Sequence, residues 1–234
     1  MRRFAASSLF VLVASCSLPA TADEEKVNLQ VVSETIEVEA PDFSDWLFEH
    51  RMEEDATPLR EEVQKWIATG RGVVLETCVV SVKSGSRTKA ESGDETIYPT
   101  EFDPPELPNA LDLSGKSEAP NTVVGGTAFE TRNEGVNFEV DPVLGIDGAT
   151  VDLNLVTEVV KQTSRIRWPV SKEHLPSSVE MPVFRTQRVT TQVTLMSGRY
   201  VLLGSSRAKE GSTPERKEPM ILHFVRADVA VPAK

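Results

Sequence analysis

The last third of the chain places the strongest constraint on its fold, because apolar and polar residues alternate there. The run 189–195, VTTQVTL, keeps its apolar side chains on one side of an extended chain, which is the period of two expected of a half-buried strand. Ser197-Gly198 is a tight-turn signal, and a second apolar run follows it. The pattern predicts a β-hairpin over residues 188–204, a polar insert at 209–219 and a closing strand at 220–231.

Strand signals also fill the middle of the chain. Residues 135–140 and 151–163 read as strands, with an Asp147-Gly148 turn between them and a loop over 169–182. Because several outward positions are polar, such as Thr190, we expect an antiparallel sheet with one wet face, or a sandwich of two sheets. Unpaired edges on such a body are able to accept a strand from a partner.

The first part of the folded chain mixes one strand with two helices. Residues 27–39 read as a strand and 72–82 as the next. Between them, a short helix carries Trp46, and a second helix begins with Thr57-Pro58, a good N-cap followed by proline at the first helical position. Gly70 is the expected helix stop. The tryptophans lie on apolar stripes, which favours core packing over a binding platform.

These signals together predict a mainly β (α+β) fold, an antiparallel β-sandwich-like body with a small N-terminal β-α-α-β portion. We expect three segments: a signal peptide at 1–22, a strand and two helices packing on the body at 23–72, and the β-domain at 73–234. A proline- and acid-rich stretch predicts a long loop at 98–126, and loops of this length are usually functional or disordered.

The N-terminus has the pattern of an export signal. Arg2 and Arg3 precede a short apolar run, and Ala20-Thr21-Ala22 offers a small-residue cleavage site, as in a secretory signal peptide. A second cleavage option is a lipobox-like sequence ending at Cys16, where an attached lipid would tether the protein to a membrane. The net charge of −11 argues against nucleic acid and against anionic membrane surfaces as partners.

The segment 188–204, RVTTQVTLMSGRYVLLG, resembles the pattern that ends the C-terminal β-domain of bacterial secretins, the ring proteins of type II and type III secretion and type IV pili. The similarity extends over residues 73–231, about two thirds of the chain, and includes Ser84-Gly85 and the strands around Asp147-Gly148. The stretch IYPTEFDPPELP also resembles short secretin-like envelope proteins of the Planctomycetes–Verrucomicrobia group. The resemblance implies a part of an envelope assembly.

The chain departs from the secretin pattern in three ways. Ser205 stands where the family has a second glycine, and the family's K-x-P-x-L-G-x-I-P stretch is replaced by a polar insert ending in Lys217-Glu218-Pro219. About 50 mature residues precede position 73, which leaves no room for a series of ring-building modules. These departures favour a docking β-domain over a channel.

We find no residues in the sequence that predict catalysis or metal binding. His50, His174 and His223 form neither an HExxH motif nor a closely spaced histidine pair, so a zinc site is not expected. The acids Glu101, Asp103 and Glu106 lack the spacing of a calcium loop. Cys78 is expected to be a buried thiol that acts as a small hydrophobe on the face of Val74, Val80 and Val82. We therefore expect no enzyme, no catalytic residue, no cofactor and no metal.

The sequence favours a non-enzymatic, exported cell-envelope protein of the periplasm, outer membrane or cell surface. We expect an accessory or structural component of a type IV pilus or of a type II/III secretion-like assembly. It would act by docking to envelope proteins, including other copies of itself, and would touch a membrane only through a lipid on Cys16. Two alternatives remain open: a minimal ring-forming outer-membrane secretin channel, and a surface adhesin or pilus subunit with an immunoglobulin-like sandwich.

Overall fold

Eight strands and two helices make up the part of the chain that the structure describes. The computed structural model describes residues 27–103, 125–169, 178–208 and 219–230. The elements follow in chain order: β1 (Asn28–Val38), α1 (Ala40–Glu49), α2 (Thr57–Ala68), β2 (Gly72–Lys83), β3 (Thr88–Phe102), β4 (Gly126–Leu144), β5 (Thr150–Pro169), β6 (Ser178–Met196), β7 (Tyr200–Arg207) and β8 (Met220–Val229).

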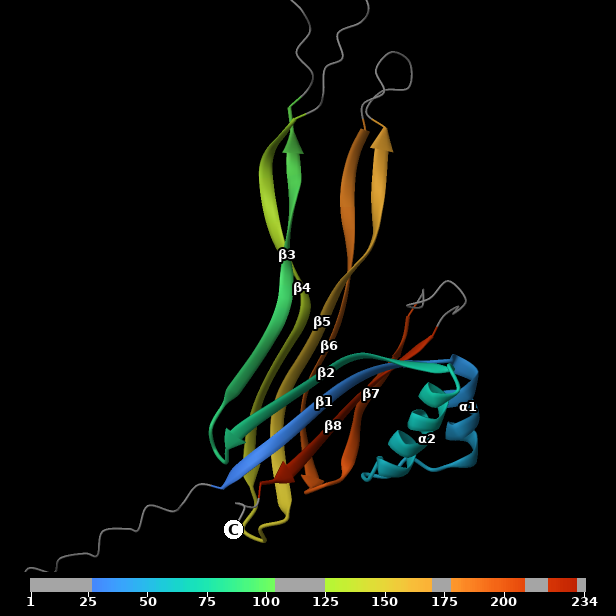
Figure 1. The fold of residues 1–234 in the computed structure, drawn as a ribbon, viewed down its shortest axis with the longest axis vertical. Helices are drawn as coiled ribbons and strands as arrows, with labels where there is room; N and C mark the ends of the chain where they lie inside the picture. The colour runs from blue at the N-terminus through green and yellow to red at the C-terminus, as the bar shows by residue number, and fades with distance from the viewer. Residues whose placement is uncertain (1–26, 104–124, 170–177, 209–218, 231–234) are drawn as a thin grey trace, which may run out of the picture.

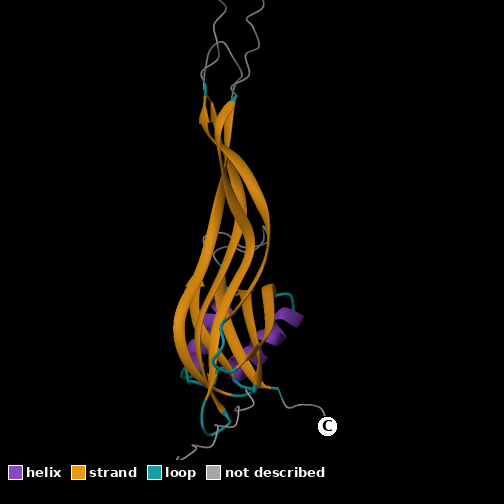
Figure 2. Ribbon diagram, turned by 90° about the vertical axis from the view of Figure 1, so that its left-hand side faces the viewer, coloured by secondary structure: helices purple, strands orange, loops and turns teal. Residues whose placement is uncertain are grey.

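The strands form two antiparallel four-stranded sheets. The first, here called the short sheet, has the order β2-β1-β8-β7, and the second, the long sheet, is a meander with the order β3-β4-β5-β6. The short sheet crosses one end of the long sheet, and the long strands continue well beyond it (Figures 1 and 2). The mainly β, α+β fold with a sandwich-like body is confirmed. β1 lies between β2 and β8 in the short sheet, so the residues before position 73 share a sheet with the C-terminal strand.

The main core lies between the two sheets. Period-two alternation gives each central strand one apolar face, and Leu29 and Val31 of β1 and Val225 of β8 point toward the long sheet from the short one. The long sheet packs against them with its own buried face, which consists of Phe138, Val140, Val151, Leu153, Leu155 and Leu195. Full burial of each such side chain contributes about 1.5–3 kcal/mol, so this layer holds the sandwich together.

The two helices cover the outer face of the short sheet. Even-numbered residues of β1 and β8 face outward, and Ile36 and Phe224 pack under Leu59 and Trp66 of α2 in a second buried cluster. Arg60 ties α2 to the sheet through two hydrogen bonds to the Glu34 carboxylate, Nε to Oε2 at 2.7 Å and Nη2 to Oε1 at 3.0 Å. As expected, the tryptophans of the two helices belong to the packing, with Trp66 buried and Trp46 partly buried against the cluster.

The predicted hairpin over 188–204 is wrong, because its two strands lie in different sheets. β6 pairs with β5, whereas β7 pairs with β8. Between them the chain crosses from the long sheet to the short one at Ser197-Gly198, with Gly198 at φ 82°. The Gly198 N–H donates to the Ala227 carbonyl at 2.9 Å, which fixes the crossing against β8. Alternation determines which face of a strand is buried, and it does not specify the partner strand.

Two predicted loops are shorter than expected because the long strands extend into them. β3 continues to Phe102, with Tyr98 opposite Glu130 of β4, so residues 98–102 form a ladder. β6 likewise begins at Ser178, inside the predicted loop at 169–182. The polar residues at the start of β3 were not predicted as a strand at all. Backbone hydrogen bonds hold these strand extensions together. The extensions have no apolar face, so the sequence does not indicate them.

Several sequence expectations fall outside the described residues. These are the signal peptide and Cys16, His174, Glu106, most of the loop expected at 98–126, and the polar insert up to residue 218.

Candidate functional site: the fork and the edges of the long sheet

The long sheet divides into two ribbons above the sandwich. Pairing between β4 and β5 runs from Leu144↔Val151 to Gly135↔Val160 and ends there. β3 and β4 remain paired up to Phe102↔Gly126, and β5 and β6 remain paired up to Pro169↔Ser178. We call these the first ribbon (94–102 with 126–134) and the second ribbon (161–169 with 178–185), and their branch point the fork. Figure 1 shows the two ribbons diverging.

A pair of glycines sits at the fork where β3 and β4 bend. Gly93 of β3 lies opposite Gly135 of β4, and Gly135 has φ 141°, a conformation that residues with a side chain rarely adopt. A Cβ on Gly93 would overlap the Glu134 carbonyl oxygen, and one on Gly135 would overlap the Ser92 carbonyl oxygen. The two backbones approach so closely that only glycine fits at either position.

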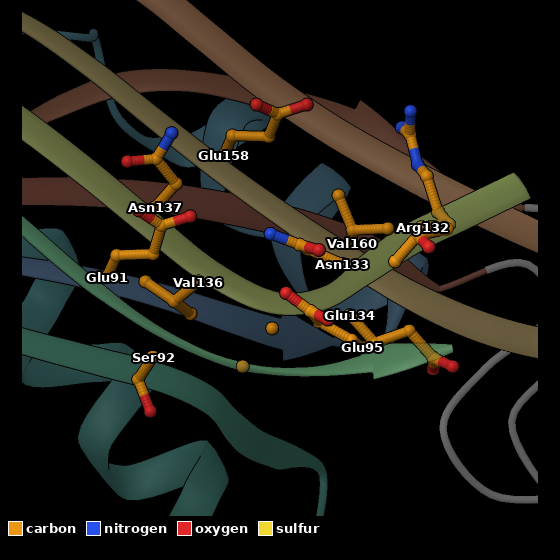
Figure 3. Close-up of a pocket in the computed structure, with 13 residues that line it drawn as sticks. Glu91, Ser92, Glu95, Arg132, Asn133, Glu134, Val136, Asn137, Glu158 and Val160 are labelled. Atoms are coloured by element: carbon orange, nitrogen blue, oxygen red, sulfur yellow. The ribbon is translucent and has the colours of Figure 1, made fainter. Parts of the chain in front are cut away.

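The Glu134 carboxylate joins three strands at the same point. It accepts a hydrogen bond from Thr96 Oγ1 of β3 at 2.6 Å and another from the Gln162 N–H of β5 at 2.7 Å. Gln162 is the first paired residue beside a register shift in the β5–β6 ladder. The side chain of Glu134 therefore supplies the acceptor that a β4 carbonyl would supply if the sheet continued. Figure 3 shows the pocket around it, lined by residues of β3, β4 and β5.

A second contact crosses the fork slightly above Glu134. Arg132 of β4 donates through Nη2 to Thr186 Oγ1 of β6 at 3.0 Å. The fork is thus bridged by side chains, while the β4 and β5 backbones that face it beyond residues 135 and 160 have no ladder between them. Sequence reasoning missed this site. The signal that could have found it is an isolated glycine within each of two extended segments, which suggests a bulge or a close backbone approach.

The outer edges of the long sheet are formed by two long strands that differ in charge, β3 and β6. β3 and β6 each have a neighbour on one side only among the described strands. β3 carries four acidic side chains and Lys89, and β6 carries one acidic side chain with Arg185 and Arg188. Exposed edge strands of this length present a row of unpaired N–H and C=O groups that can pair with another chain.

The ribbons also expose large apolar side chains. Ile97 is 65% exposed and Phe129 61% exposed on the first ribbon, and Trp168 is 59% exposed on the second. In the sandwich the same strands bury side chains of this size. An interaction surface on the ribbons would therefore combine backbone edges with apolar contacts.

Among the described residues, those with possible reactive chemistry do not converge. His223 is buried and lies 3.1 Å from Thr35 Oγ1 through its Nδ1, and burial lowers the pKa of its imidazole. His50 instead stacks on Trp46 at the exposed end of α1, with ring centroids 4.7 Å apart. Glu101 and Asp103 lie at the tip of the first ribbon. Among the described residues, no group of three histidine, cysteine or acidic side chains is arranged to hold a metal ion.

Cys78 is a free thiol on β2 that is partly rather than fully buried. It packs against the main core with Val80 and Val82, and burial raises the pKa of its thiol. Val74, expected on the same buried face, is 37% exposed, because a register shift at Thr35/Ile36 interrupts the β1–β2 ladder. In the described part of the chain, neither helix is long and apolar enough to cross a membrane.

Comparison with known proteins gives matches among solved structures alone. No protein-family model matches the chain, and no curated protein matches it. The InvG secretin domain from the Salmonella SPI-1 injectisome is similar at 8% identity and a TM-score of 0.45, over 89% of this chain and 64% of that one. ExeD of Aeromonas hydrophila is similar at 12% identity and a TM-score of 0.43, over 89% and 49%.

A third match is to the AspS–GspD pilotin–secretin complex of enterotoxigenic Escherichia coli (ETEC), at 12% identity and a TM-score of 0.45, over 88% of this chain and 50% of that one. The chain thus spans between about half and two thirds of the length of these three structures. The InvG and GspD structures are described as secretins, which is the class of protein that the sequence motifs resemble.

Proposed function

We propose that this protein is a non-enzymatic structural component of a cell-envelope assembly of the secretion or type IV pilus kind. It acts by protein–protein docking along the open edges of its long sheet. The observation that carries the proposal is that β3 and β6 are long strands with one edge unpaired among the described strands, and that both extend past the core into ribbons. The secretin-like motif at 188–204 supports an envelope assembly as the setting.

Docking along an edge requires a second extended segment that supplies the complementary backbone groups. Main-chain hydrogen bonds give such pairing its affinity, and side-chain contacts give its specificity. The exposed Ile97 and Trp168 beside the edges provide apolar contacts of this kind. The predicted signal peptide at 1–22 supports export as the route by which the protein meets its partners.

The charges of the two edges favour a second copy of the chain as one such partner. Asp94 and Glu95 lie exposed on β3, and Arg188 lies exposed on β6. A β6 edge of one copy placed beside the β3 edge of the next brings opposite charges together, whereas β3 beside β3 brings like charges together. Head-to-tail contacts of this kind produce closed rings or open filaments. This is the second candidate function, a minimal ring-forming component.

An immunoglobulin-like adhesin or pilus subunit is less well supported by the topology. Immunoglobulin sandwiches use Greek-key connections between their two sheets. Here the long sheet is a simple meander, β3 to β6 in chain order.

The test is the mass of the mature protein, from Asp23, measured by light scattering during size-exclusion chromatography. We expect a concentration-dependent assembly in the wild type. The charge reversals Arg188→Glu and Asp94→Lys with Glu95→Lys should each reduce the assembly, and mixing the two variants should restore it, because each then meets an edge of opposite charge.

Protein that remains a monomer at all concentrations would exclude self-assembly and leave docking to a different partner. The matched control is Asp147→Asn, which changes a charge in the β4–β5 turn away from either edge. If this control lowered the mass as much as the edge variants do, the effect would come from net charge and the proposal would be wrong.

A further inference from the structure

The helical layer exposes a patch of apolar side chains that do not pack against the rest of the protein. Phe48 of α1 is 93% exposed, and the neighbouring Leu47 and Met52 are 40% and 42% exposed. Phe43, five residues earlier and on the opposite side of the helix, is 4% exposed and anchors α1 in the core. α1 therefore has two apolar sides, one buried under the molecule and one in solvent, whereas a surface helix normally has one.

Some acids of the helical layer have a basic partner, and others do not. Asp42 pairs with Arg71 at 2.6 Å, Glu62 pairs with Lys65 at 2.7 Å, and Asp55 pairs with Arg199 at 3.2 Å. The acids that flank Phe48 have no hydrogen bond or ion pair to any described residue; these are Asp45, Glu49, Glu53 and Glu54. Residues 45–54 thus place four acids and one basic residue, Arg51, around the exposed apolar side chains, which leaves an excess of negative charge there.

The patch is presented on a fixed platform. Asp42 and Arg71 tie the start of α1 to the end of α2, and the Trp46 and His50 rings stack at the other end of α1. Binding at a rigid surface costs little conformational entropy. An exposed aromatic anchor within a polar rim is also the arrangement that dominates binding energy in protein interfaces.

We propose that the exposed surface around Phe48 near the end of α1, with Leu47 and Met52 beside it in the chain and their flanking acids, is a docking surface for a basic segment of another protein. The segment carries lysine or arginine side chains next to large apolar ones. Its apolar side chains cover Phe48, and its cations lie against Asp45, Glu49 and Glu53. The charge complementarity favours such a peptide over an anionic lipid surface, which the same carboxylates repel.

This surface is separate from the edges of the long sheet. The helices lie on the outer face of the short sheet, away from both ribbons (Figures 1 and 2). One copy is therefore able to bind a partner through α1 while its β3 and β6 edges are occupied, and the two contacts are tested by different variants.

The experiment measures the fluorescence anisotropy of a labelled 14-residue peptide of lysine and leucine, arranged with one apolar helical face, against the mature protein. Phe48→Ser is expected to weaken binding about tenfold or more, as for a central anchor residue. Glu49→Gln with Glu53→Gln is expected to weaken binding at low salt. The matched control is Ile146→Ser, which removes a fully exposed large apolar side chain from the β4–β5 turn and should leave the affinity unchanged.

Two further controls define the chemistry of the partner. A peptide with serine for leucine keeps only the charge, and one with glutamate for lysine keeps only the apolar face; both are expected to bind weakly. The edge variant Arg188→Glu should bind the probe like the wild type, so failure of edge docking and failure of this surface are distinguishable.

The proposal is overturned if Phe48→Ser binds the probe like the wild type, or if Ile146→Ser loses as much affinity. Equal binding of the serine peptide would mean general attraction to an acidic protein. If Phe48→Ser instead lowered the mass of the self-associated protein, the α1 surface would be a contact between copies. Because Phe48 is almost fully exposed, the variant is expected to keep the wild-type melting temperature, which confirms that any loss is local.

Discussion

The four strands of the long sheet have two different environments along their length. Where they cross the short sheet, Phe138 and Leu153 are at most 2% exposed. Past the fork, Phe129 and Trp168 of the same strands are about 60% exposed. Strand geometry is the same in both halves, so the difference comes from the presence or absence of a second layer. The sandwich half contains the core, and we propose that the ribbon half supplies edges and apolar surface for partners.

The comparison also explains why the fork needs special residues. A four-stranded sheet that loses its opposing layer has no core to keep its strands together. At that point the chain places two glycines and the Glu134 carboxylate, which end the β4–β5 ladder with a side-chain acceptor. The fork marks the boundary between the half that folds the protein and the half that we propose assembles it.

The largest expected effect is a difference in the free energy of unfolding between two matched substitutions, one in each half. Phe138→Ala, in the main core, should lower the free energy of unfolding by about 3–5 kcal/mol, because it leaves a cavity between the sheets. Phe129→Ala, on the first ribbon, should change it by no more than about 0.5 kcal/mol. Urea denaturation of the two variants measures both values, and similar losses would show that the ribbons belong to the same packed unit as the sandwich.

The next effect concerns the fork glycine of β4. Gly135→Ala forces a Cβ against the Ser92 carbonyl at φ 141°, and strain at such a position costs roughly 1–3 kcal/mol. Amide hydrogen exchange should show lost protection in β3 and the adjoining part of β4, with β5 and β6 less affected. Gly204→Ala is the control, because a Cβ there meets no atom within 4 Å. Equal exchange in both variants would contradict the close approach at the fork.

A smaller, local effect is expected at Glu134. Glu134→Ala removes the acceptor for Thr96 and for the Gln162 N–H, which should cost about 1–2 kcal/mol and increase exchange at the Gln162 amide. Glu134→Gln keeps one carbonyl acceptor and should lie between the alanine variant and the wild type. Nuclear magnetic resonance of the Gln162 amide reports the contact directly, and an unchanged signal in the alanine variant would exclude this hydrogen bond.

The smallest effect is a pH dependence that belongs to the sandwich half. Burial lowers the pKa of His223 in the folded state, so the unfolded chain binds more protons below the ordinary histidine pKa of about 6.5. The stabilisation is therefore complete above that pH and declines as the pH falls below it. Melting temperatures between pH 7 and pH 5 should show this decline in the wild type and a smaller one in His223→Gln. Identical profiles would assign the dependence to other groups.

The sequence predicted the parts of the fold in which burial leaves a pattern. Val189 to Leu195 and the two helices with Pro58 and Gly70 were recognisable, because one apolar side faces a core. The partner strand of β6 was not recognisable. The alternation of apolar and polar residues is the same whether the next strand forms a hairpin with β6 or crosses to another sheet. β3 was not predicted because, as an edge strand, it buries few apolar side chains. Ala90 is its residue that packs against the main core cluster.

The candidate site was less predictable than the fold. The unpaired edges were expected in general terms from an antiparallel body. Their positions depend on where the β4–β5 ladder ends, and no single residue encodes that end. Glu134 reads as one acid among many, and its role emerges only from the approach of Thr96 and Gln162. Phe48 was not singled out in the short helix predicted around Trp46, because its exposure depends on how that helix packs.

The most direct test of the central claim is a cross-linking measurement between the two edges of different copies. One batch carries Ser92→Cys on β3 and another carries Thr190→Cys on β6, two exposed positions that leave Asp94, Glu95 and Arg188 in place. Both batches also carry Cys78→Ser, and the two are mixed with a short bifunctional thiol reagent. We predict that the β3–β6 dimer exceeds both homodimers and disappears when Asp94→Lys is added to the β3 batch. Equal amounts of all three dimers, or none above a Cys-free control, would contradict assembly through these edges.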